Sequence, residues 1–123
     1  MGFGIKIVQN DEMIQRLKDD IEFLKTLPLY IALDNDIVIS HASCTSVWHL
    51  RDKSDGVETF ESHILWSRQS PKGNSPIFNI YGHTPFKEAR VGSRYINIDT
   101  GACYFGKLSA YCIESKEVIE YNR

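Results

Sequence analysis

Two histidines follow apolar, strand-like segments at matching places in the sequence. His41 comes directly after Ile-Val-Ile-Ser, and His83 comes after Ile-Tyr-Gly. The exit of a strand is where a sheet exposes functional groups, because the strand is rigid and the following loop is free to vary. Neutral imidazole is the commonest side-chain ligand of divalent transition metals. Two interpretations therefore stay open: a pair of structural histidines, or two ligands of one metal ion.

The segments before His41 predict a helix and a hairpin. Asn10 is a typical helix N-cap, and the apolar residues that follow recur at spacings of three and four, as one face of a helix requires, at Ile14, Leu17, Ile21 and Leu24. Pro28 ends this helix. Residues 29–33 and 37–40 then predict two strands around a tight turn, and the second strand, being β-branched and apolar, is expected to be central.

The remaining segments predict a sheet with a helical insert. Residues 43–57 are mixed and polar, which favours a loop, and residues 58–68 predict a helix. Strands are expected at residues 77–81, 95–98, 108–113 and 118–121, with the last two forming a closing hairpin. One helix, two strands, a helical insert and four strands are typical of an α/β sheet layer, with an α+β arrangement as the alternative.

Size and composition restrict the class of protein. The chain of 123 residues is long enough for a single domain, residues 1–123. Its net charge of −2, with 14 basic and 16 acidic residues, does not favour nucleic-acid binding. No apolar stretch of about 18 residues predicts a membrane span. The first residues lack the layout of a secretion signal, and Lys6 stands where an N-myristoylation motif requires Ser or Thr.

The cysteines do not predict a disulfide framework or a thiolate zinc site. There are three, Cys44, Cys103 and Cys112, and none stands in a CxxC pair. They are expected to be small, semi-buried residues in a reducing compartment. We therefore expect the protein in the cytoplasm.

Several segments resemble those of a known family. In chain order they are Leu-Pro-Leu-Tyr with Ile-Val-Ile-Ser-His-Ala, then Ile-Leu-Trp-Ser-Arg, Tyr-Gly-His-Thr-Pro, Tyr-Ile-Asn-Ile-Asp-Thr-Gly-Ala, and Gly-Lys-Leu-Ser-Ala-Tyr. Between Leu27 and Ala110 this pattern resembles the carboxyl-terminal part of bacterial serine/threonine protein phosphatases and the related dinucleoside-tetraphosphate hydrolases, both metallophosphoesterases. The resemblance implies half of a calcineurin-like phosphoesterase domain, a β-sandwich flanked by helices.

The resemblance also implies roles for single residues. His41 and His83 would be ligands of one of two metal ions, with manganese expected and iron or zinc as alternatives. Arg68 would contact phosphate, since guanidinium meets phosphate oxygens bidentately; a solvated cation at a helix end is an equal alternative. Asp99, before Thr-Gly, is expected to hold its own turn through side-chain-to-backbone bonds. Support of a metal-binding histidine is the lesser possibility.

Half of the family's active site has no counterpart in the sequence. The Gly-Asp-x-His, Gly-Asp-x-x-Asp-Arg-Gly and Gly-Asn-His-Glu motifs are missing, and no Gly-Asp dipeptide occurs anywhere. Because a catalytic zinc site needs at least three protein ligands, we expect this chain alone to bind metal weakly or not at all. The missing part predicts an exposed edge or apolar face, and hence an N-terminal half or a homodimer mate as partner.

The predicted function is hydrolysis of phosphomonoesters by metal-activated water, with a phosphorylated protein or a small phosphoester as substrate. The first alternative is a dinucleoside-polyphosphate hydrolase, which uses much the same motifs. The second is a non-catalytic half-domain that acts as a binding or regulatory module, which the missing motifs favour. Whether the isolated chain is an enzyme stays open.

Overall fold

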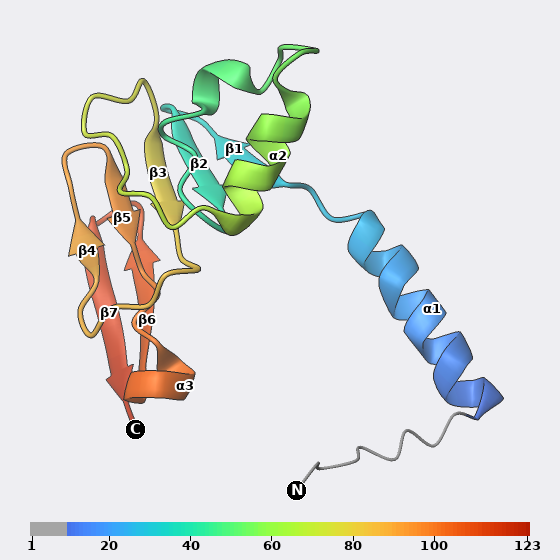
Figure 1. The fold of residues 1–123 in the computed structure, drawn as a ribbon. Helices are drawn as coiled ribbons and strands as arrows, with labels where there is room; N and C mark the ends of the chain where they lie inside the picture. Colours follow the sequence, from blue (N-terminus) through green and yellow to red (C-terminus); the bar gives the residue numbers. More distant parts are fainter. Residues whose placement is uncertain (1–9) are drawn as a thin grey trace, which may run out of the picture.

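A computed structural model describes residues 10–123 of the chain, so the interpretation of the first residues as free of a targeting or lipidation signal lies outside the described part. The elements are α1 (Asp11–Lys25), β1 (Tyr30–Leu33), β2 (Ile37–Ser40), a 3-10 turn (Trp48–Leu50), α2 (Val57–Trp66), β3 (Phe78–Tyr81), β4 (Arg90–Val91), β5 (Tyr95–Asn97), α3 (Ala102–Phe105), β6 (Lys107–Cys112) and β7 (Glu117–Asn122). Figure 1 shows their arrangement as a mixed α/β fold.

The main sheet has five strands in the order β1-β2-β3-β5-β4. β2, β3 and β5 run parallel, and β1 and β4 are antiparallel strands at the two edges. β6 and β7 form a separate antiparallel hairpin. Because the three central strands are parallel, their carboxyl ends meet at the same edge of the sheet. The predicted central position of the strand before His41 is confirmed.

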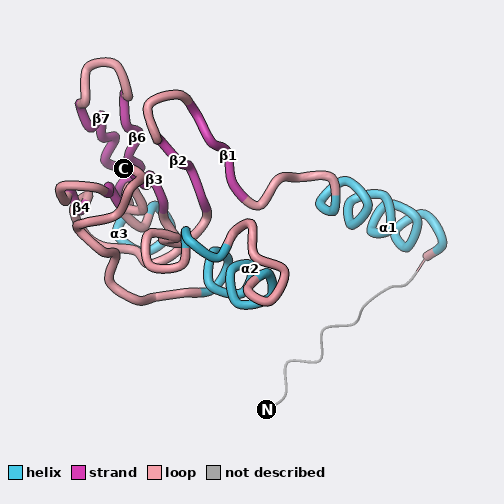
Figure 2. The backbone as a smooth tube through the Cα atoms, turned by 90° about the horizontal axis from the view of Figure 1, so that it is seen from above, coloured by secondary structure: helices cyan, strands magenta, loops and turns pink. Residues whose placement is uncertain are grey.

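The core lies between the sheet and α2. Its fully or nearly fully buried members are Val38, Cys44, Val47, Phe60, Ile64 and Ile77. Val38 of β2 faces α2 and belongs to the core. Ile39 of β2 and Ile80 of β3 instead border a hollow together with Ser109 of β6. α2 and the β6–β7 hairpin therefore cover opposite faces of the sheet, as the view from above also shows (Figure 2). Alternating side-chain directions along each strand produce these two faces.

The turn between β1 and β2 follows directly from its residues. Asn35 and Asp36 both adopt left-handed backbone, with φ of 63° and 60°. Two such residues in a row are typical of the tight turns that match the twist of antiparallel strands, and Asn and Asp tolerate this backbone best after glycine. The turn sets the register in which Tyr30 pairs with Ser40, so that the chain leaves β2 at His41.

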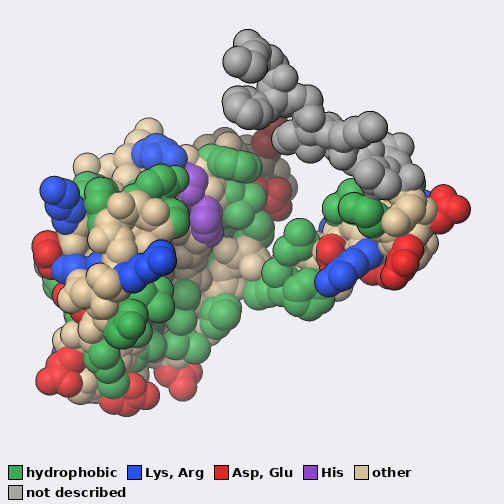
Figure 3. All heavy atoms as spheres, turned by 90° about the horizontal axis from the view of Figure 1, so that it is seen from below, with side chains coloured by type: hydrophobic (Ala, Val, Ile, Leu, Met, Phe, Trp, Pro, Cys, Tyr) green, Lys and Arg blue, Asp and Glu red, His purple; other side chains and the backbone are tan. Residues whose placement is uncertain are grey.

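α1 begins and ends as predicted but lies apart from the sheet. The Asn10 side chain accepts a hydrogen bond of 2.7 Å from the Met13 amide, and Asp11 and Glu12 occupy the first turn. None of the helix residues is buried. Figures 1 and 2 both show α1 projecting from β1 on a short connection, and Figure 3 shows hydrophobic side chains on the surface of this arm.

Several sequence predictions need correction. Five strands, not four, follow the helical insert, because Arg90 and Val91 pair briefly with β5. A further short helix, α3, stands where only a turn was expected after residue 98. Trp66 and Phe105 are 73% and 47% exposed and each lines a hollow, so both stand at cleft walls and not in the core. The three free cysteines range from buried Cys44 to exposed Cys103, so burial is not shared by all of them. Within residues 10–123, none of the helices combines the length and the apolar character that crossing a membrane requires.

Candidate metal and phosphate site

The parallel strands bring three of the predicted site residues to one edge of the sheet. His41 follows β2, His83 follows β3 after Gly82, and Asp99 follows β5. All three border the same small hollow of about 270 Å³ at the strand ends. The Gly82 amide donates a 2.9 Å hydrogen bond to the His41 carbonyl, which continues the strand pairing to the point where the histidines leave the sheet.

The two predicted metal ligands touch each other. Nε2 of His41 lies 2.9 Å from Nδ1 of His83, and their ring centroids are 4.6 Å apart. His83 has a positive φ of 70°, a backbone that non-glycine residues seldom adopt. Such backbone costs on the order of 1–2 kcal/mol and tends to be retained at functional sites. The backbone of His83 is thus held in an uncommon conformation that turns its ring toward His41.

The spacing of the two nitrogens fits neighbouring positions around one metal ion. Ligand nitrogens lie about 2.0–2.1 Å from a zinc-sized ion, so two adjacent ones are separated by roughly 3.0–3.4 Å, depending on the angle between them. The observed 2.9 Å is close to that range. Within residues 10–123, no group of three or more His, Cys, Asp or Glu side chains is placed to hold a metal ion. The spacing is therefore compatible with two neighbouring metal ligands, and the role of the pair as ligands stays a prediction.

The electrostatics favour a neutral His41. Partial burial lowers its pKa most, the nearby His83 ring lowers it further, and the carboxylate of Asp99 raises it in opposition. The net pKa lies below the usual value of 6.5, so at neutral pH the ring has a lone pair available for a metal. The two facing nitrogens share a hydrogen bond, in which the donor is the one that carries the ring proton.

Asp99 makes the turn contact expected of it. Its Oδ1 accepts a 3.1 Å hydrogen bond from the Gly101 amide, and its own amide donates to Oδ1 of Asn97 at 2.8 Å. The side chain also lies close to Gly82, where an added Cβ would come within 3.2 Å of the Asp99 Cβ. Gly82 therefore lets the His83 loop approach β5 closely. A role of Asp99 in support of a metal ligand stays a prediction.

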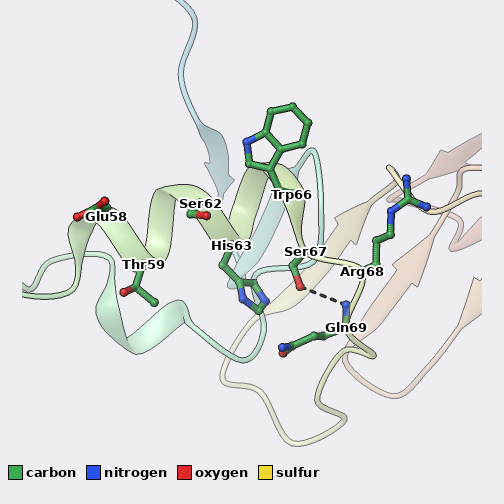
Figure 4. Close-up of a pocket in the computed structure, with 8 residues that line it drawn as sticks. All are labelled: Glu58, Thr59, Ser62, His63, Trp66, Ser67, Arg68 and Gln69. Carbon is green, nitrogen blue, oxygen red and sulfur yellow. Dashed lines mark hydrogen bonds between the residues drawn. The ribbon is translucent and has the colours of Figure 1, made fainter.

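Arg68 lies between two surface hollows. It is exposed and follows α2 by two residues. The first hollow, about 560 Å³, runs along α2 from Glu58 to Gln69, and Figure 4 shows Arg68 at its end, extended away from the helix. The second, about 590 Å³, joins Arg68 with His83, Asp99 and α3. The structure therefore places Arg68 and His83 on the border of one hollow, while phosphate contact stays a prediction.

The other two histidines do not border the hollows that contain His41 or His83. His63 lines the hollow on α2 and shares a 3.0 Å hydrogen bond with the Ser46 hydroxyl, and burial lowers its pKa. His49 is exposed. Trp66, by contrast, stands edge-on to His83 with centroids 6.3 Å apart. Trp66 belongs to the Ile-Leu-Trp-Ser-Arg segment of the family resemblance, but no role at the site was predicted for it.

The sequence analysis also missed α3. This single turn adds Tyr104 and Phe105 to the border of the hollow that contains Arg68 and His83. The signal for it lies in two glycines five residues apart, Gly101 and Gly106, which both adopt left-handed backbone, with φ of 64° and 73°, and bracket the turn.

Comparison with known proteins gives a partial match. No family model matches the chain. Over 113 residues it is 34% identical to the bis(5'-nucleosyl)-tetraphosphatase PrpE [asymmetrical] of Oceanobacillus iheyensis, covering 80% of this chain and 44% of that protein. The protein of the same name from Geobacillus sp. (strain WCH70) is 30% identical over 115 residues, covering 83% and 46%. This chain is homologous to a part of these proteins.

A third relative shows a partial match of similar extent. The PrpE protein of Bacillus cereus (strain AH187) is 41% identical over 105 residues, which cover 75% of this chain and 42% of the relative. The chain thus spans less than half the length of the curated relatives it matches. Homology to part of PrpE agrees with the predicted resemblance to one portion of a phosphoesterase domain.

Proposed function

We propose that this chain supplies one part of a divalent-metal site that hydrolyses nucleoside polyphosphates, as in a bis(5'-nucleosyl)-tetraphosphatase of the metallophosphoesterase superfamily. The observation that carries the proposal is the 2.9 Å contact between His41 and His83 at the ends of two parallel strands. The homology to part of the PrpE proteins gives this pair a chemical context.

Each residue has a definite part in the proposal. His41 and His83 would hold one metal ion, for which manganese is the first candidate and iron or zinc the alternatives. Divalent ions in such sites polarise phosphoryl oxygens and lower the pKa of bound water. Arg68 would bind a phosphate oxygen through its guanidinium fork. Asp99 would keep the loops after β3 and β5 together through its carbonyl, which accepts a 3.0 Å hydrogen bond from the Phe86 amide.

The names of the relatives support nucleoside polyphosphates over phosphoproteins as substrate, although the sequence analysis placed phosphomonoesters first. In this proposal the five-stranded sheet and the β6–β7 hairpin correspond to half of a β-sandwich. The partner is the N-terminal part that supplies the missing ligands, in the reducing cytoplasm. Cys44 is suited to that setting because burial raises the pKa of its thiol to about 11, which keeps the thiol unreactive.

A second candidate is a non-catalytic role as a binding or regulatory module. The observation that favours it is the absence of a third metal ligand beside His41 and His83 in residues 10–123. A metal held by two protein ligands would be bound weakly. The two candidates differ in what happens when the remaining ligands are supplied.

The test is complementation. The purified chain is mixed with the part of a PrpE relative that it does not cover, and diadenosine tetraphosphate hydrolysis is measured with manganese. We expect turnover in the mixture and little in either part alone. His83→Ala should lower the rate by more than about 100-fold, because losing a ligand costs more than losing a group that only supports one.

His49→Ala is the matched control, since His49 is an exposed histidine away from the pair and its loss should leave the rate unchanged. A mixture that stays inactive would favour the non-catalytic module. Equal activity of the His83 and His49 variants would contradict the assigned ligand.

A further inference from the structure

The hollow beside α3 is lined by a cationic side chain and by aromatic side chains. Arg68 and His83 border it, and so do Tyr104 and Phe105 of α3. Its volume of about 590 Å³ falls within the range of roughly 300–1,000 Å³ that small-molecule sites occupy. The same hollow reaches the histidine pair through His83, so a ligand that fills it would extend from the proposed metal site onto the aromatic rings.

The aromatic side chains of the hollow come from α3, a single turn that lies between Gly101 and Gly106. The amides of Tyr104 and Phe105 both donate to the Gly101 carbonyl, at 2.9 and 2.6 Å, and this closes a single helical turn. A Cβ at Gly101 would come within 2.6 Å of Cδ2 of Phe105, so the Phe105 ring lies directly against the glycine backbone. This close packing holds the Phe105 ring in place, whereas the turn leaves the side chain of Tyr104 exposed.

Tyr104 is the free ring of this pair. It is 75% exposed, and its plane is inclined by 55° to that of Phe105, with centroids 6.4 Å apart. Because the two rings are not stacked on each other, a face of Tyr104 is available to a third planar group. An exposed aromatic ring beside a cationic groove is the arrangement by which proteins bind nucleotides, with bases stacked on the ring and phosphates held by the charge.

We propose that the hollow at α3 is a nucleobase subsite, in which one base of a nucleoside polyphosphate stacks on Tyr104 while its phosphates reach Arg68 and the histidine pair. This inference rests on the proposed function for its substrate class, and it adds the residues that recognise the nucleoside.

The experiment compares ATP with inorganic tripolyphosphate as probes. Dissociation constants for both are measured by calorimetry on the full chain, on Tyr104→Ala and on Tyr104→Phe. We expect ATP to bind more tightly than tripolyphosphate. Tyr104→Ala should weaken ATP binding by about tenfold and leave tripolyphosphate binding unchanged, because only the base loses its partner. Tyr104→Phe keeps the ring and should keep ATP affinity within about twofold.

Tyr121→Ala is the matched control, because Tyr121 is 71% exposed and lies on β7. It should bind both probes like the unchanged chain. The inference is overturned if ATP is not preferred at up to millimolar concentration, if Tyr104→Ala leaves ATP affinity unchanged, or if it weakens both probes equally.

The two proposals fail in different ways. A Tyr104-dependent preference for ATP together with an inactive complementation mixture would leave a nucleotide-binding site without the hydrolytic function. Hydrolysis that depends on His83 but is indifferent to Tyr104 would leave the metal site and remove the nucleobase subsite. Only hydrolysis and a Tyr104-dependent preference together support both.

Discussion

At the scale of single residues, Asn79 fixes the loop that begins with His41. This side chain is fully buried on β3. Its Oδ1 accepts a hydrogen bond from the Cys44 amide at 2.9 Å, and its Nδ2 donates to the Val38 carbonyl and the Ser40 hydroxyl at 3.1 and 2.9 Å. One amide thus joins β3 to the end of β2 and to the chain just beyond His41. The approach of His41 to His83 depends on this connection.

Replacing Asn79 with Ala should therefore lower the free energy of unfolding by about 3 kcal/mol or more, because buried polar groups that lose their partner cost about 1–3 kcal/mol each. Urea denaturation followed by circular dichroism measures the change. Asn74→Ala, at an exposed loop position, is the control and should stay within about 0.5 kcal/mol of the unchanged chain. Similar losses for the two variants would show that the Asn79 network contributes little.

The sequence predicted the histidine pair better than it predicted Asn79 or Trp66. His41 and His83 could be found because a polar residue at the end of an apolar strand stands out in a local pattern. The partners of Asn79 are 35 and more positions away in the chain, so no local pattern indicates them. Trp66 lines the hollow along α2 while 73% exposed, and its edge-on contact with His83 comes from a residue 17 positions away, so no local pattern indicates that contact.

At the scale of elements, α1 is the least supported helix in the described part of the chain. Its capping residues and its stripe of apolar side chains follow the local rules, yet Leu17, Phe23 and Leu24 are about 60% exposed or more. Isolated helices of about 15 residues are marginal in water, because most helix stability comes from packing. α1 must therefore open much more readily than the sheet.

Amide hydrogen exchange should show this difference. Amides of α1 are expected to exchange orders of magnitude faster than those of β2 and β3, whose strands lie inside the sheet, because local opening is cheap where few contacts are buried. Protection of α1 equal to that of β3 would contradict the arrangement. Such protection would mean that the apolar stripe is covered in solution, by a second copy or another partner.

Some helices and strands could be predicted from local sequence patterns alone, and others could not. α1, β1, β2 and the β6–β7 hairpin were predicted because caps, alternation and turn residues act within a few positions. β4 was not, because two residues without apolar alternation form a strand only through the neighbouring β5. α3 was missed because its four residues have no helical periodicity, and only the flanking glycines define it.

At the scale of the whole molecule, the chain presents a site that is open on one side. Two imidazoles and one arginine border hollows at the ends of the parallel strands, and the match covers less than half of each homologous protein. The fold class followed from the order of elements. The incompleteness of the site was predicted from the three family motifs that the sequence lacks, and the coverage of less than half of each relative agrees with that prediction.

The most direct test is whether manganese selects His41 and His83 over the other histidines. The chain has four histidines, so His49 and His63 serve as internal controls in one proton NMR spectrum. Paramagnetic Mn²⁺, added stepwise at neutral pH, should broaden the imidazole signals of His41 and His83 first, and His83→Ala should remove the effect on His41. Broadening of all four histidines together, or of His49 or His63 ahead of the pair, would contradict the proposed metal site.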